Sequence, residues 1–456
     1  MSFPAYPEYK DSGVAWLGEV PVHWSRKPLK FLTNFVNGAA FRPEDWSDEG
    51  VPIVRIENLN ESDSFNRYNG EVHQRYHVRQ GDLLFGWSGN KGTSFGPFIW
   101  RRSGLHYLNQ HIFRLTDFSV DRDWLYWALR SVTETIEDEA HGIIGMVHVT
   151  KGKLGSIQIP VMGLEEQKKI ANFLNHQTAR IDALIEEQQR LIELLKEKRQ
   201  AVISHAVTKG LDPEVPMKDS GVEWLGEVPE HWVVDRIKWS ISLCKNGVWG
   251  DDPQGNANDF PCVRVADFNR YRMRVALDDP TIRNVSASER AGRVLQRGDL
   301  VLEKSGGGEK QPVGFVVLYE DQRDAVCSNF TARIALGEGM VPSFWRYVHG
   351  AAYSIRLNVP SIKQTSGIQN LDQNSYFDER AAFPPPEEQR AIADFLDEET
   401  DRIDKLIREA LGSIDLLKER RSALISAAVT GKIDVRDWTP PASSTEPEHE
   451  GEGAVT

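Results

Sequence analysis

Residues 10–24 read KDSGVAWLGEVPVHW, and residues 218–232 read KDSGVEWLGEVPEHW, so the two stretches differ at two positions only. A second pair follows further along the chain. Residues 165–174 (EEQKKIANFL) are matched by residues 387–396 (EEQRAIADFL), and each stretch opens a helical run that ends in AVT. A repeat of roughly 200 residues is far longer than a solenoid repeat, so the sequence predicts a duplicated domain unit.

The composition limits the class of protein. The chain has 456 residues, of which 40% are hydrophobic and 27% are charged, which is enough for two or three cored domains. It has no run of about 18 apolar residues and no basic, apolar leader, so we expect a cytoplasmic protein. The three cysteines all lie in the second half without a short paired spacing. We therefore expect three buried thiols, with neither disulfides nor a zinc site.

The net charge of -13 argues, taken alone, against a nucleic-acid binder. Its distribution weakens that argument, because residues 25–159 carry about 16 basic and 16 acidic side chains, and residues 233–386 carry about 19 and 18. The acidity lies in the repeats, the helical runs and the last residues. Residues 433–456 combine Glu with Pro, Ser and Gly, a composition typical of a disordered tail.

Short apolar runs rich in Val, Ile and Phe lie between the repeats, and they match from one half to the other. VPIVRI at 51–56 matches FPCVRV at 260–265, and a helix-like stretch at 124–129 matches 344–348. The offset between the halves grows from 208 at the first repeat to 222 at the helical runs, and each step can be placed in a polar stretch. The pattern predicts an α+β fold in which two similar, mixed but mainly β domains share a scaffold and differ in their loops.

The two helical runs carry a heptad pattern. The first has apolar residues at Leu174, Ile181, Leu195 and Val202 and, at the offset three residues later, at Leu184 and Leu191. The second has Leu396, Ile403, Ala410, Leu417 and Leu424, with Leu406 at the other position. Such a seam must be buried, so we expect the two helices to join the domains as an antiparallel coiled coil of roughly 64 Å in a pseudo-twofold molecule. The alternative is that each helix packs on its own domain.

The sequence carries no recognisable catalytic or cofactor motif. The P-loop, the nucleophile elbow, the HExxH motif and the zinc-deaminase signature are all absent. Neither half contains the Asn-Pro-Pro-aromatic motif with which amino-methylating enzymes hold a flipped base. We therefore expect neither catalytic residues nor a metal site. The alternative is an enzyme whose active site is assembled only on folding.

Polar, glycine-rich stretches follow two equivalent predicted strands, GDLLFGW and GDLVLEK. Glycine lets the backbone approach a ligand closely, while Ser, Asn, Lys and Gln offer donors and acceptors to phosphates and base edges. The candidate DNA-binding residues are Ser88, Asn90, Lys91 and Thr93 in the first half and Ser305, Lys310 and Gln311 in the second. The alternative is a pair of hairpin turns.

Three further polar stretches are candidates for DNA contact. Residues 269–274 interleave arginines with a tyrosine, which suits a DNA backbone but also a solvated face. Other stretches contain amide side chains, which can read adenine and which also cap and turn chains. The residues concerned are Arg270, Arg272, Arg274, Asn109, Gln110, His111, Asn329, Lys363, Gln364, Thr365 and Gln369.

Together these motifs resemble the DNA-specificity subunit of type I restriction-modification systems. The resemblance rests on the KDSG-x-x-WLGE-x-P-x-HW repeat, the GDL turn, the entries to the long helices (160–167 and 385–389) and their AVT ends, and it extends from residue 10 to about 432. It implies two target-recognition domains that each read half of a bipartite DNA site, with a fixed unread gap set by the coiled coil. A Val-Met-Gly sequence replaces the usual proline-rich entry of the first helix, and the acidic tail has no counterpart in the repeat.

The resemblance also implies partners. They are double-stranded DNA, two methyltransferase subunits and motor-nuclease subunits. This chain would be non-catalytic and bind no cofactor itself, because S-adenosylmethionine, ATP and magnesium would belong to the partner subunits. Two alternatives remain at this stage, a specificity subunit of a modification-only system and a coiled-coil scaffold that does not bind DNA.

These observations divide the chain into seven segments. They are a repeat segment (1–24), a target-recognition domain (25–160), a long helix (161–210), a second repeat segment (211–232), a second target-recognition domain (233–384), a second long helix (385–432) and the acidic tail (433–456).

Overall fold

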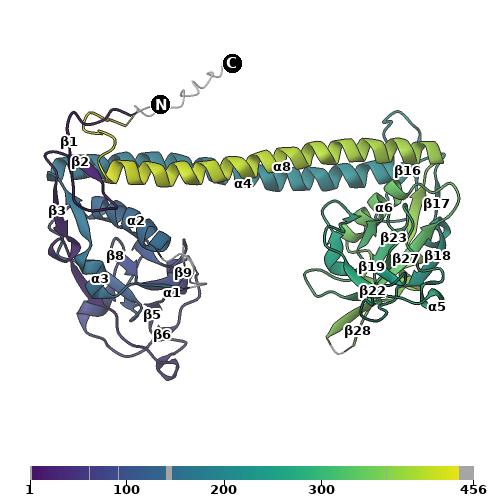
Figure 1. The fold of residues 1–456 in the computed structure, drawn as a ribbon, viewed down its shortest axis with the longest axis horizontal. Coiled ribbons are helices and arrows are strands. Elements are labelled where there is room, and N and C mark those ends of the chain that lie inside the picture. Colours follow the sequence, from purple (N-terminus) through teal and green to yellow (C-terminus); the bar gives the residue numbers. More distant parts are fainter. Residues whose placement is uncertain (1–2, 61, 91, 140–145, 366, 441–456) are drawn as a thin grey trace, which may run out of the picture. The chain divides into compact units, whose positions relative to one another are not determined.

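The computed structural model describes residues 3–60, 62–90, 92–139, 146–365 and 367–440, which fall into two compact units (Figure 1). Unit 1 runs to Gln188 and resumes at Gly412, and unit 2 runs from Gln189 to Leu411. The boundary crosses both long helices, α4 (Leu164–Lys209) and α8 (Pro386–Val429). Each unit therefore contains one globular domain with half of α4 and half of α8.

The globular part of unit 1 has two main sheets. One is antiparallel with the order β10-β8-β12-β4, and the other has the order β6-β5-β11-β7 with β5 and β11 parallel. The strands of unit 1 are β1 (Tyr9–Asp11), β2 (Glu19–Pro21), β3 (Ser25–Pro28), β4 (Asn34–Asn37), β5 (Val51–Val54), β6 (Arg67–Tyr68), β7 (His77–Val78), β8 (Leu83–Gly86), β9 (Ser88–Asn90), β10 (Gly96–Ile99), β11 (His106–Leu108), β12 (Ile112–Thr116), β13 (Met146–His148) and β14 (Gln158–Val161). Its helices besides the long ones are α1 (Ile56–Leu59), α2 (Arg122–Glu139) and α3 (Lys151–Ser156).

Unit 2 has a six-stranded sheet of order β18-β27-β23-β25-β21-β20 and two three-stranded sheets, β22-β19-β26 and β24-β29-β28. Its strands are β15 (Met217–Asp219), β16 (Glu227–Pro229), β17 (Val233–Arg236), β18 (Ile241–Asn246), β19 (Asp259–Val263), β20 (Phe268–Asn269), β21 (Arg274–Val275), β22 (Thr281–Asn284), β23 (Leu300–Glu303), β24 (Ser305–Gly306), β25 (Val316–Leu318), β26 (Val326–Cys327), β27 (Thr331–Leu336), β28 (Ile362–Thr365), β29 (Ile368–Leu371) and β30 (Arg380–Phe383). Its shorter helices are α5 (Ala287–Arg290), α6 (Pro342–Ser354) and α7 (Gln373–Phe377).

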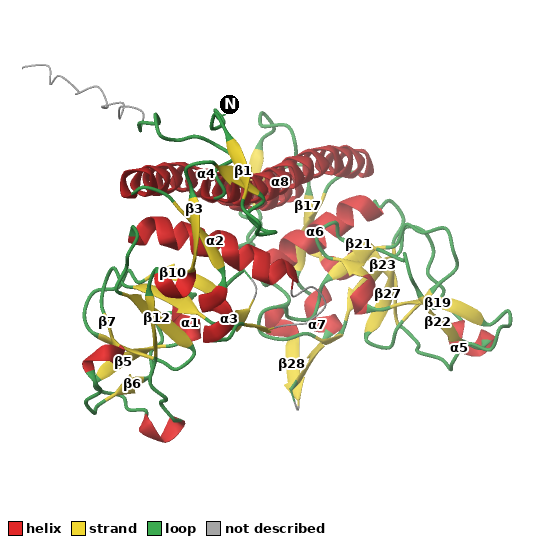
Figure 2. Cartoon of the chain, turned by 60° about the vertical axis from the view of Figure 1, so that its left-hand side comes forward, coloured by secondary structure: helices red, strands yellow, loops and turns green. Residues whose placement is uncertain are grey.

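The two globular domains share one scaffold, as the sequence predicts. The order β10-β8-β12-β4 in unit 1 is repeated as β25-β23-β27-β18 in unit 2, and the parallel pair β5-β11 is repeated as β19-β26. α2 packs on β10 and α6 packs on β25, in each case between the strands and the long helices (Figure 2). Strands β20 and β21 extend the sheet of unit 2 only, and they lie between residues 265 and 298, where the second copy is longer than the first. The fold is α+β with two similar domains.

The GDL motif starts the central strand of each domain. Gly81 and Gly298 have φ values of +91° and +100°, a region that residues with a side chain rarely enter. The aspartate that follows accepts a hydrogen bond from a backbone amide, Asp82 from Arg79 at 2.8 Å and Asp299 from Gln296 at 2.6 Å. The motif therefore fixes a tight turn before the buried strands β8 and β23.

The repeated hairpin and the start of a long helix hold each other in both units. β1 pairs with β2 in unit 1, and β15 pairs with β16 in unit 2. The indole of Trp24 is fully buried and donates to Glu166 Oε1 at 2.9 Å. In unit 2, buried Trp232 donates to Glu388 Oε2 at 2.8 Å. The tryptophan that ends each repeat thus fixes the first turn of α4 or α8.

The glutamine of the EEQ sequence links the long helix to the shorter domain helix. Gln167 donates to the Met162 carbonyl at 2.8 Å and accepts from the Asp121 amide, just before α2, at 2.7 Å. Gln389 makes the equivalent contact in unit 2, where it accepts from the Val341 amide before α6 at 2.9 Å. These buried hydrogen bonds explain why the Glu-Gln pair occurs in both copies.

The halves of α4 and α8 run antiparallel within each unit. In unit 1, Phe173 of α4 shares a core with Val429 near the end of α8, while Asp182, further along α4, bonds Arg421, earlier in α8. In unit 2, Ile203 shares a core with Leu396, and Arg199 bonds Asp404. The same helix halves also pack on the globular domain of their unit. Antiparallel pairing of the two helices and packing of each helix on a domain therefore occur together.

One of the two seam positions was predicted wrongly. Leu174, Ile181, Leu195, Leu396, Ile403 and Ala410 are buried as predicted, but Leu184, Leu191 and Leu406 are 46%, 43% and 44% exposed. The second buried position lies four residues after the first and is occupied by Thr178, Ile192, Arg199, Thr400, Ile407 and Ile414. This position was not recognised in the sequence because three of its residues are polar. They can be buried because Thr178 and Thr400 donate to the backbone one turn earlier and Arg199 pairs with Asp404.

The N-terminal repeat of unit 1 closes on the far end of the chain. Gly431, just after α8, has a φ of +75°, and a Cβ there would lie 2.4 Å from Pro21 Cδ. The Tyr9 hydroxyl donates to the Gly431 carbonyl at 3.0 Å, and the Asp434 amide donates to the Pro4 carbonyl at 2.7 Å. In unit 2 the repeat packs instead on the end of α4, which precedes it in sequence.

Across the described residues, no helix is long and apolar enough to cross a membrane.

Candidate nucleic-acid interface

A small sheet in unit 2 gathers several of the predicted DNA-binding residues. β29 pairs with both β24 and β28, so Ser305 and Lys363 each lie opposite Asn370, and Gln364 lies opposite Gln369. The β28–β29 hairpin projects on the side of unit 2 away from its long-helix segments (Figure 1). The loop after β23 is therefore joined to a distant hairpin, and the two predicted loops form one surface.

The side chains on this surface have different roles. Gln369 is buried and accepts a hydrogen bond from the Val313 amide at 3.2 Å, so it shapes the loop. Ser305 Oγ donates to Asn370 Oδ1 at 2.6 Å. Lys310, Gln311 and Gln364 are exposed and have no ion pair among the described residues. These three are therefore the most accessible candidates on the small sheet.

Two further predicted residues belong to the same hairpin. Lys363 is exposed and forms an ion pair with Asp372 at 2.7 Å, an interaction weak enough at a surface to be exchanged for a phosphate. Thr365 belongs to β28, but its side chain lies outside the described residues. DNA contact by both residues stays a prediction.

A pocket of about 440 Å³ opens beside this surface, and the predicted residues Ser305 and Asn329 both line it. Its walls include the side chains of Trp249 and Phe330, which are 39% and 45% exposed. Glu303, at the end of β23, also lines the pocket and is 1% exposed. The pocket thus combines apolar walls with a buried carboxylate.

In unit 1 the equivalent loop also forms a strand. β9 pairs with β13, which lies far along the chain, and Ser88 at its start is buried. Asn90 and Thr93 are exposed, and the Thr93 hydroxyl donates to the Asn90 carbonyl at 3.3 Å. Lys91 lies outside the described residues. The loop connects the antiparallel strands β8 and β10, as the hairpin-turn alternative expects, and it also pairs with the distant strand β13.

The second predicted stretch of unit 1 is organised by Trp87. Gln110 and His111 are exposed, whereas Asn109 is 7% exposed and its side-chain carbonyl accepts from the His111 amide at 3.2 Å. The Trp87 indole donates to the Gln110 carbonyl at 3.0 Å, and its ring lies 5.6 Å from that of His111. His148, which the sequence did not single out, packs edge-on against the same indole with ring centroids 4.7 Å apart.

The arginines of the basic segment in unit 2 bond within the protein. Arg270 reaches into the domain, while Arg272 and Arg274 reach α8. The ion pairs are Arg270 with Glu303 at 2.7 Å, Arg272 with Asp401 at 3.9 Å, and Arg274 with Asp397 at 3.2 Å and Glu320 at 2.8 Å. The segment therefore attaches the domain to the long helix. Arg272 is exposed, and its contact with DNA stays a prediction.

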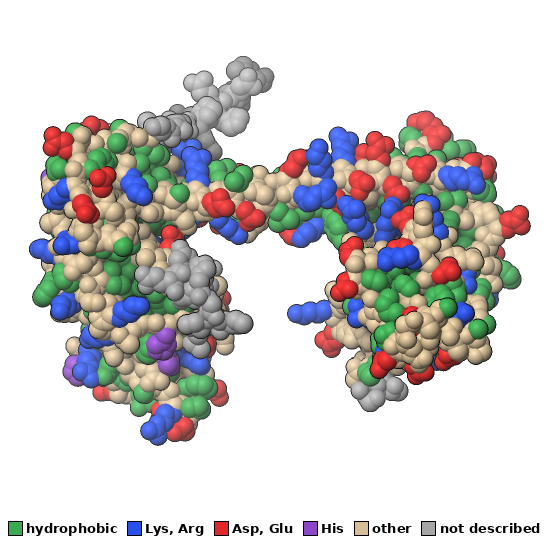
Figure 3. Space-filling view, viewed as in Figure 1, with side chains coloured by type: hydrophobic (Ala, Val, Ile, Leu, Met, Phe, Trp, Pro, Cys, Tyr) green, Lys and Arg blue, Asp and Glu red, His purple; other side chains and the backbone are tan. Residues whose placement is uncertain are grey.

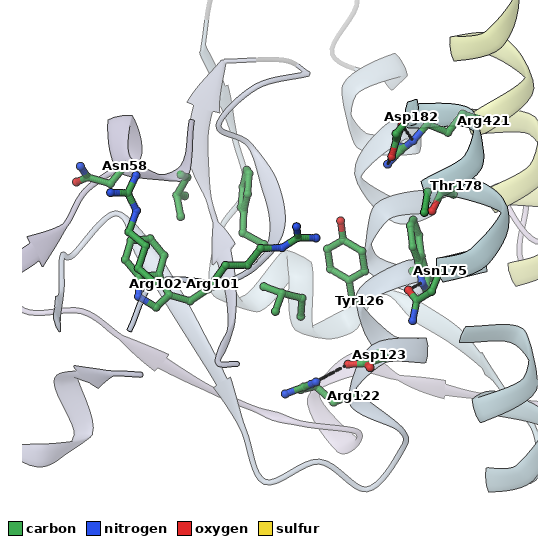
Figure 4. A pocket seen from close by; sticks show the side chains of 16 residues that line it. Asn58, Arg101, Arg102, Arg122, Asp123, Tyr126, Asn175, Thr178, Asp182 and Arg421 are labelled. Carbon is green, nitrogen blue, oxygen red and sulfur yellow. Dashed lines mark hydrogen bonds and ion pairs between the residues drawn. The ribbon is translucent and has the colours of Figure 1, made fainter. Parts of the chain in front are cut away.

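Where the second copy has this segment, unit 1 has a cavity. Four residues around this space in unit 1, namely Asn175, Thr178, Asp182 and Arg421, correspond at the offset of 222 to Asp397, Thr400, Asp404 and Arg199 in unit 2. In unit 2, Arg272, Arg274 and Arg346 fill the space, which leaves about 50 Å³. In unit 1 the space is about 630 Å³, and Figure 4 shows Arg101 and Tyr126 reaching into it opposite the Asp182–Arg421 pair. We call this space the junction cavity.

The surface charge agrees with the near-neutral count of the domains. On the face shown in Figure 3, Lys and Arg are mixed with Asp and Glu, without one continuous basic area. Among the described residues, no group of three His, Cys, Asp or Glu side chains could hold a metal ion. Cys262 and Cys327 are buried and Cys244 is half-buried, and burial raises the pKa of the Cys262 thiol to about 12. None of these thiols is ionised at neutral pH.

Sequence reasoning missed the aromatic residues at the candidate surfaces. Trp87 and His148 in unit 1, and Trp249 and Phe330 in unit 2, lie beside the polar residues that were predicted. A usable signal was present for Phe330, which directly follows Asn329 before a predicted strand. Trp249 gave no such signal, because it reaches the pocket from a loop far from Asn329 in sequence.

The comparisons with known proteins agree on one family. Residues 21–194 match the family model of the type I restriction modification DNA specificity domain. The specificity subunit of the type I restriction enzyme EcoBI of Escherichia coli is 28% identical over 267 residues, which span 55% of this chain and 54% of that protein. The specificity subunit of MjaVIII of Methanocaldococcus jannaschii is 23% identical over 437 residues, which span 92% of this chain and 95% of that one.

Two solved structures share the fold. A chain from a type I restriction-modification system, studied for its assembly and conformational transition, has a TM-score of 0.65 at 14% identity and covers 90% of this chain and 98% of its own. The HsdS subunit from Thermoanaerobacter tengcongensis has a TM-score of 0.51 at 16% identity, with 91% and 98% covered. The duplicated fold of this chain is thus shared with both solved structures. In sequence this chain is similar to type I restriction-modification specificity subunits, and its residues 21–194 match their DNA specificity domain.

Proposed function

We propose that this chain is the non-catalytic subunit that selects the DNA target of a type I restriction-modification complex. Each globular domain reads one half of a bipartite site in duplex DNA, and the sequence between the halves is not read. Methyltransferase and motor-nuclease subunits bind the chain and supply the chemistry, with S-adenosylmethionine, ATP and magnesium bound by those partners. The assembly acts in the cytoplasm, where its DNA lies.

One observation carries this proposal. The two domains share the strand order, the GDL turn and the Trp–Glu contact to a long helix, yet their exposed loops differ in sequence and length. A shared scaffold with different loops is what two readers of unlike DNA segments require, because specificity depends on side chains that reach base edges. A protein scaffold without DNA would have no need for this divergence. The two half-sites should therefore differ.

The long helices are proposed to set the unread gap. α4 contains 46 residues, which correspond to roughly 69 Å at 1.5 Å per residue. Because half-site spacing follows from protein geometry, a helical spacer of fixed length gives a fixed gap. Inserting four residues, about one turn, into both helices should lengthen the gap and leave both half-sites unchanged. Recovery of the original gap from an intact complex would contradict this role.

The helices also offer surfaces for partners. Leucines that are 43% to 67% exposed lie on the outside of the helix halves, Leu184 and Leu416 in unit 1 and Leu191, Leu194, Leu406 and Leu411 in unit 2. Apolar residues are common singly at surfaces, but their concentration on two helices favours a protein interface. Similar surfaces in both units suit two copies of one methyltransferase subunit.

Single-molecule methylation sequencing tests the function directly. DNA is compared from cells that express the neighbouring methyltransferase subunit with and without this chain. We expect a new methylated-adenine motif of two unlike blocks separated by a fixed gap. An active, intact complex that yields no new motif would refute the proposal. Loss of DNA affinity with rising salt, measured on the assembled complex, separates DNA binding from a protein-only scaffold.

Exchange of one domain tests independent reading. Residues 25–160 are replaced by those of another family member, and the methylated motif is determined again. One half-site should change while the other half-site and the gap stay the same. A change in both half-sites would mean that the domains do not read independently.

A further inference from the structure

We propose that the pocket beside β23 in unit 2 takes up one nucleobase, extruded from the half-site that this unit reads. The pocket is the 440 Å³ space lined by Trp249, Arg264, Glu303, Ser305, Asn329 and Phe330. The inference rests on the proposed DNA-reading function and goes beyond it, because a base in this pocket would be recognised outside the double helix.

The walls of the pocket are aromatic and fixed in position. The Arg283 guanidinium lies over the Trp249 ring at 4.8 Å and donates to the Trp249 carbonyl at 3.1 Å. The main chain at Phe330 is held as well, because its carbonyl accepts from the Lys304 and Ser305 amides at 2.8 and 3.1 Å. Rigid aromatic faces bind bases of any sequence by stacking. Two of them at one opening suit a planar heterocycle.

Glu303, which lines the pocket, has a carboxylate that would select among heterocycles. Glu303 is 1% exposed, and its Oε2 accepts from Arg270 Nη2 at 2.7 Å. A carboxylate has about four lone-pair positions, so this one keeps capacity for donors from a ligand. The exocyclic amino groups of cytosine, adenine and guanine are such donors. Glu303 therefore favours a base with an amino group over thymine.

The hydrogen bonds of Arg270, the partner of Glu303, are incomplete. Arg270 Nη1 is buried without a hydrogen-bond partner among the described residues, and its guanidinium lies 4.9 Å from the Phe315 ring centroid. Burial of Glu303 raises the pKa of its carboxyl in spite of the neighbouring guanidinium. A buried pair with incomplete hydrogen bonding costs stability, which is expected at a site kept for binding.

The backbone around the pocket leaves room for a close approach. Gly306 and Gly307 follow β23 with φ values of +115° and +63°, and no atom lies within 4 Å of a Cβ built on Gly306. The volume falls within the usual range for sites that bind small ligands. The exposed polar residues of the small sheet lie next to this opening, so a duplex held by them would present its bases there.

Unit 1 provides an internal comparison. At the offset of 217, Gly86 stands where unit 2 has Glu303, and a Cβ on Gly86 would lie 2.2 Å from the Ser94 carbonyl oxygen. At the offset of 219, His111 stands where unit 2 has Phe330, and its ring packs against Trp87. The acid and the open aromatic pair are therefore features of unit 2, and capture of a base is assigned to this unit alone.

A mismatch scan on the assembled complex tests the inference. The DNA contains the half-site of unit 2, identified by domain exchange, and at each position in turn only the partner-strand base is changed to create a mismatch. Unpairing costs less for a mismatched base, so capture predicts that a mismatch at one position tightens binding by about tenfold. Positions of methylated adenines are left out, because a methyltransferase must extrude its own target.

Variants of the pocket assign the effect. Glu303→Gln and Phe330→Ala should each remove the gain at that position, and Phe330→Ala should weaken binding to matched DNA by about tenfold. Ile355→Ala is the control, because Ile355 is 48% exposed in the same unit and does not line the pocket. If Glu303→Gln fails to fold, which circular dichroism would reveal, the surface variant Phe330→Ala decides the outcome.

Two outcomes overturn the inference and leave the proposed function standing. In the first, the wild-type complex binds its site specifically, but no mismatch in the half-site tightens binding. In the second, a gain exists and persists undiminished in Phe330→Ala. Absence of sequence-specific binding by the wild-type complex is a different result, because it would refute the proposed function itself.

Discussion

Replacing Asp404 with asparagine should destabilise unit 2 strongly, because it removes one partner of a buried ion pair between α4 and α8. The side chains of Arg199 and Asp404 are 11% and 3% exposed, and the Arg199 Nε to Asp404 Oδ1 distance is 3.2 Å. The same guanidinium donates to the Tyr271 carbonyl at 2.8 Å and lies over the Tyr271 ring at 4.4 Å, so it cannot simply turn toward water. Breaking such a pair costs about 3–5 kcal/mol.

The equivalent pair in unit 1 is the matched control. Asp182 and Arg421 lie 2.9 Å apart, but their side chains are 47% and 21% exposed, so Asp182→Asn should cost about 1 kcal/mol or less. For a unit of this size, 1 kcal/mol lowers the melting temperature by roughly 2–4 °C. We therefore expect a decrease of about 6–12 °C or more for Asp404→Asn and of at most about 4 °C for Asp182→Asn.

Differential scanning calorimetry of the two variants measures these shifts, and hydrogen exchange of amides around residues 199 and 182 assigns each transition to its unit. Equal decreases in the two variants, or a larger decrease for Asp182→Asn, would refute the reasoning that burial decides the cost. An unchanged melting temperature in Asp404→Asn would mean that Arg199 finds another partner.

Three further outcomes are expected. Desolvation lowers the pKa of fully buried His349 to about 4, so the unfolded chain takes up a proton first as pH falls below about 6.5. The free energy of unfolding of unit 2 should therefore decrease by about 1.4 kcal/mol between pH 8 and pH 5.5, and urea unfolding of His349→Gln should lack this part of the decrease. Gly431→Ala should lower the free energy of unfolding by about 1–2 kcal/mol because of the φ of +75°, and by more because the added Cβ would lie 2.4 Å from Pro21. Limited proteolysis should detect release of the chain ends. Gly210→Ala is the control and should have a smaller effect, because the nearest atom to its Cβ is 3.2 Å away. Leu416 is 67% exposed, so Leu416→Glu should change the free energy of unfolding by less than about 0.5 kcal/mol. Titration calorimetry should show at least tenfold weaker binding of a methyltransferase subunit, and unchanged binding would contradict a docking role for this face.

The sequence could predict those features that depend on local patterns. The GDL turn needs only a glycine with positive φ and the aspartate after it, and the strands that follow are continuous apolar runs. The duplication made each of these patterns visible twice. The long helices were equally clear, because neither Pro nor Gly interrupts residues 165–207.

Features that depend on distant partners could not be predicted. The loop containing Asn90 became a strand because β13, far along the chain, pairs with it. The ion pairs of Arg272 and Arg274 could not be foreseen, because their partners, Asp401 and Asp397, belong to a helix that begins at residue 386; DNA contact by the two arginines stays a prediction. The seam position at Arg199 was missed because a charged residue is expected in a seam only once its counter-charge is known. Lys91 lies outside the described residues, so its prediction stands untested.

The junction cavity has a consequence for how new specificities can be made. In unit 2, the recognition domain is attached to α8 by Arg272 and Arg274 on Asp401 and Asp397, so a foreign domain grafted there would strand these carboxylates unless it brought matching cations. In unit 1 the same space is about 630 Å³ and is bordered by Asn175, which carries no charge. The first domain should therefore be the easier one to exchange, and under the proposed function DNA targets should vary more freely in the half-site assigned to unit 1.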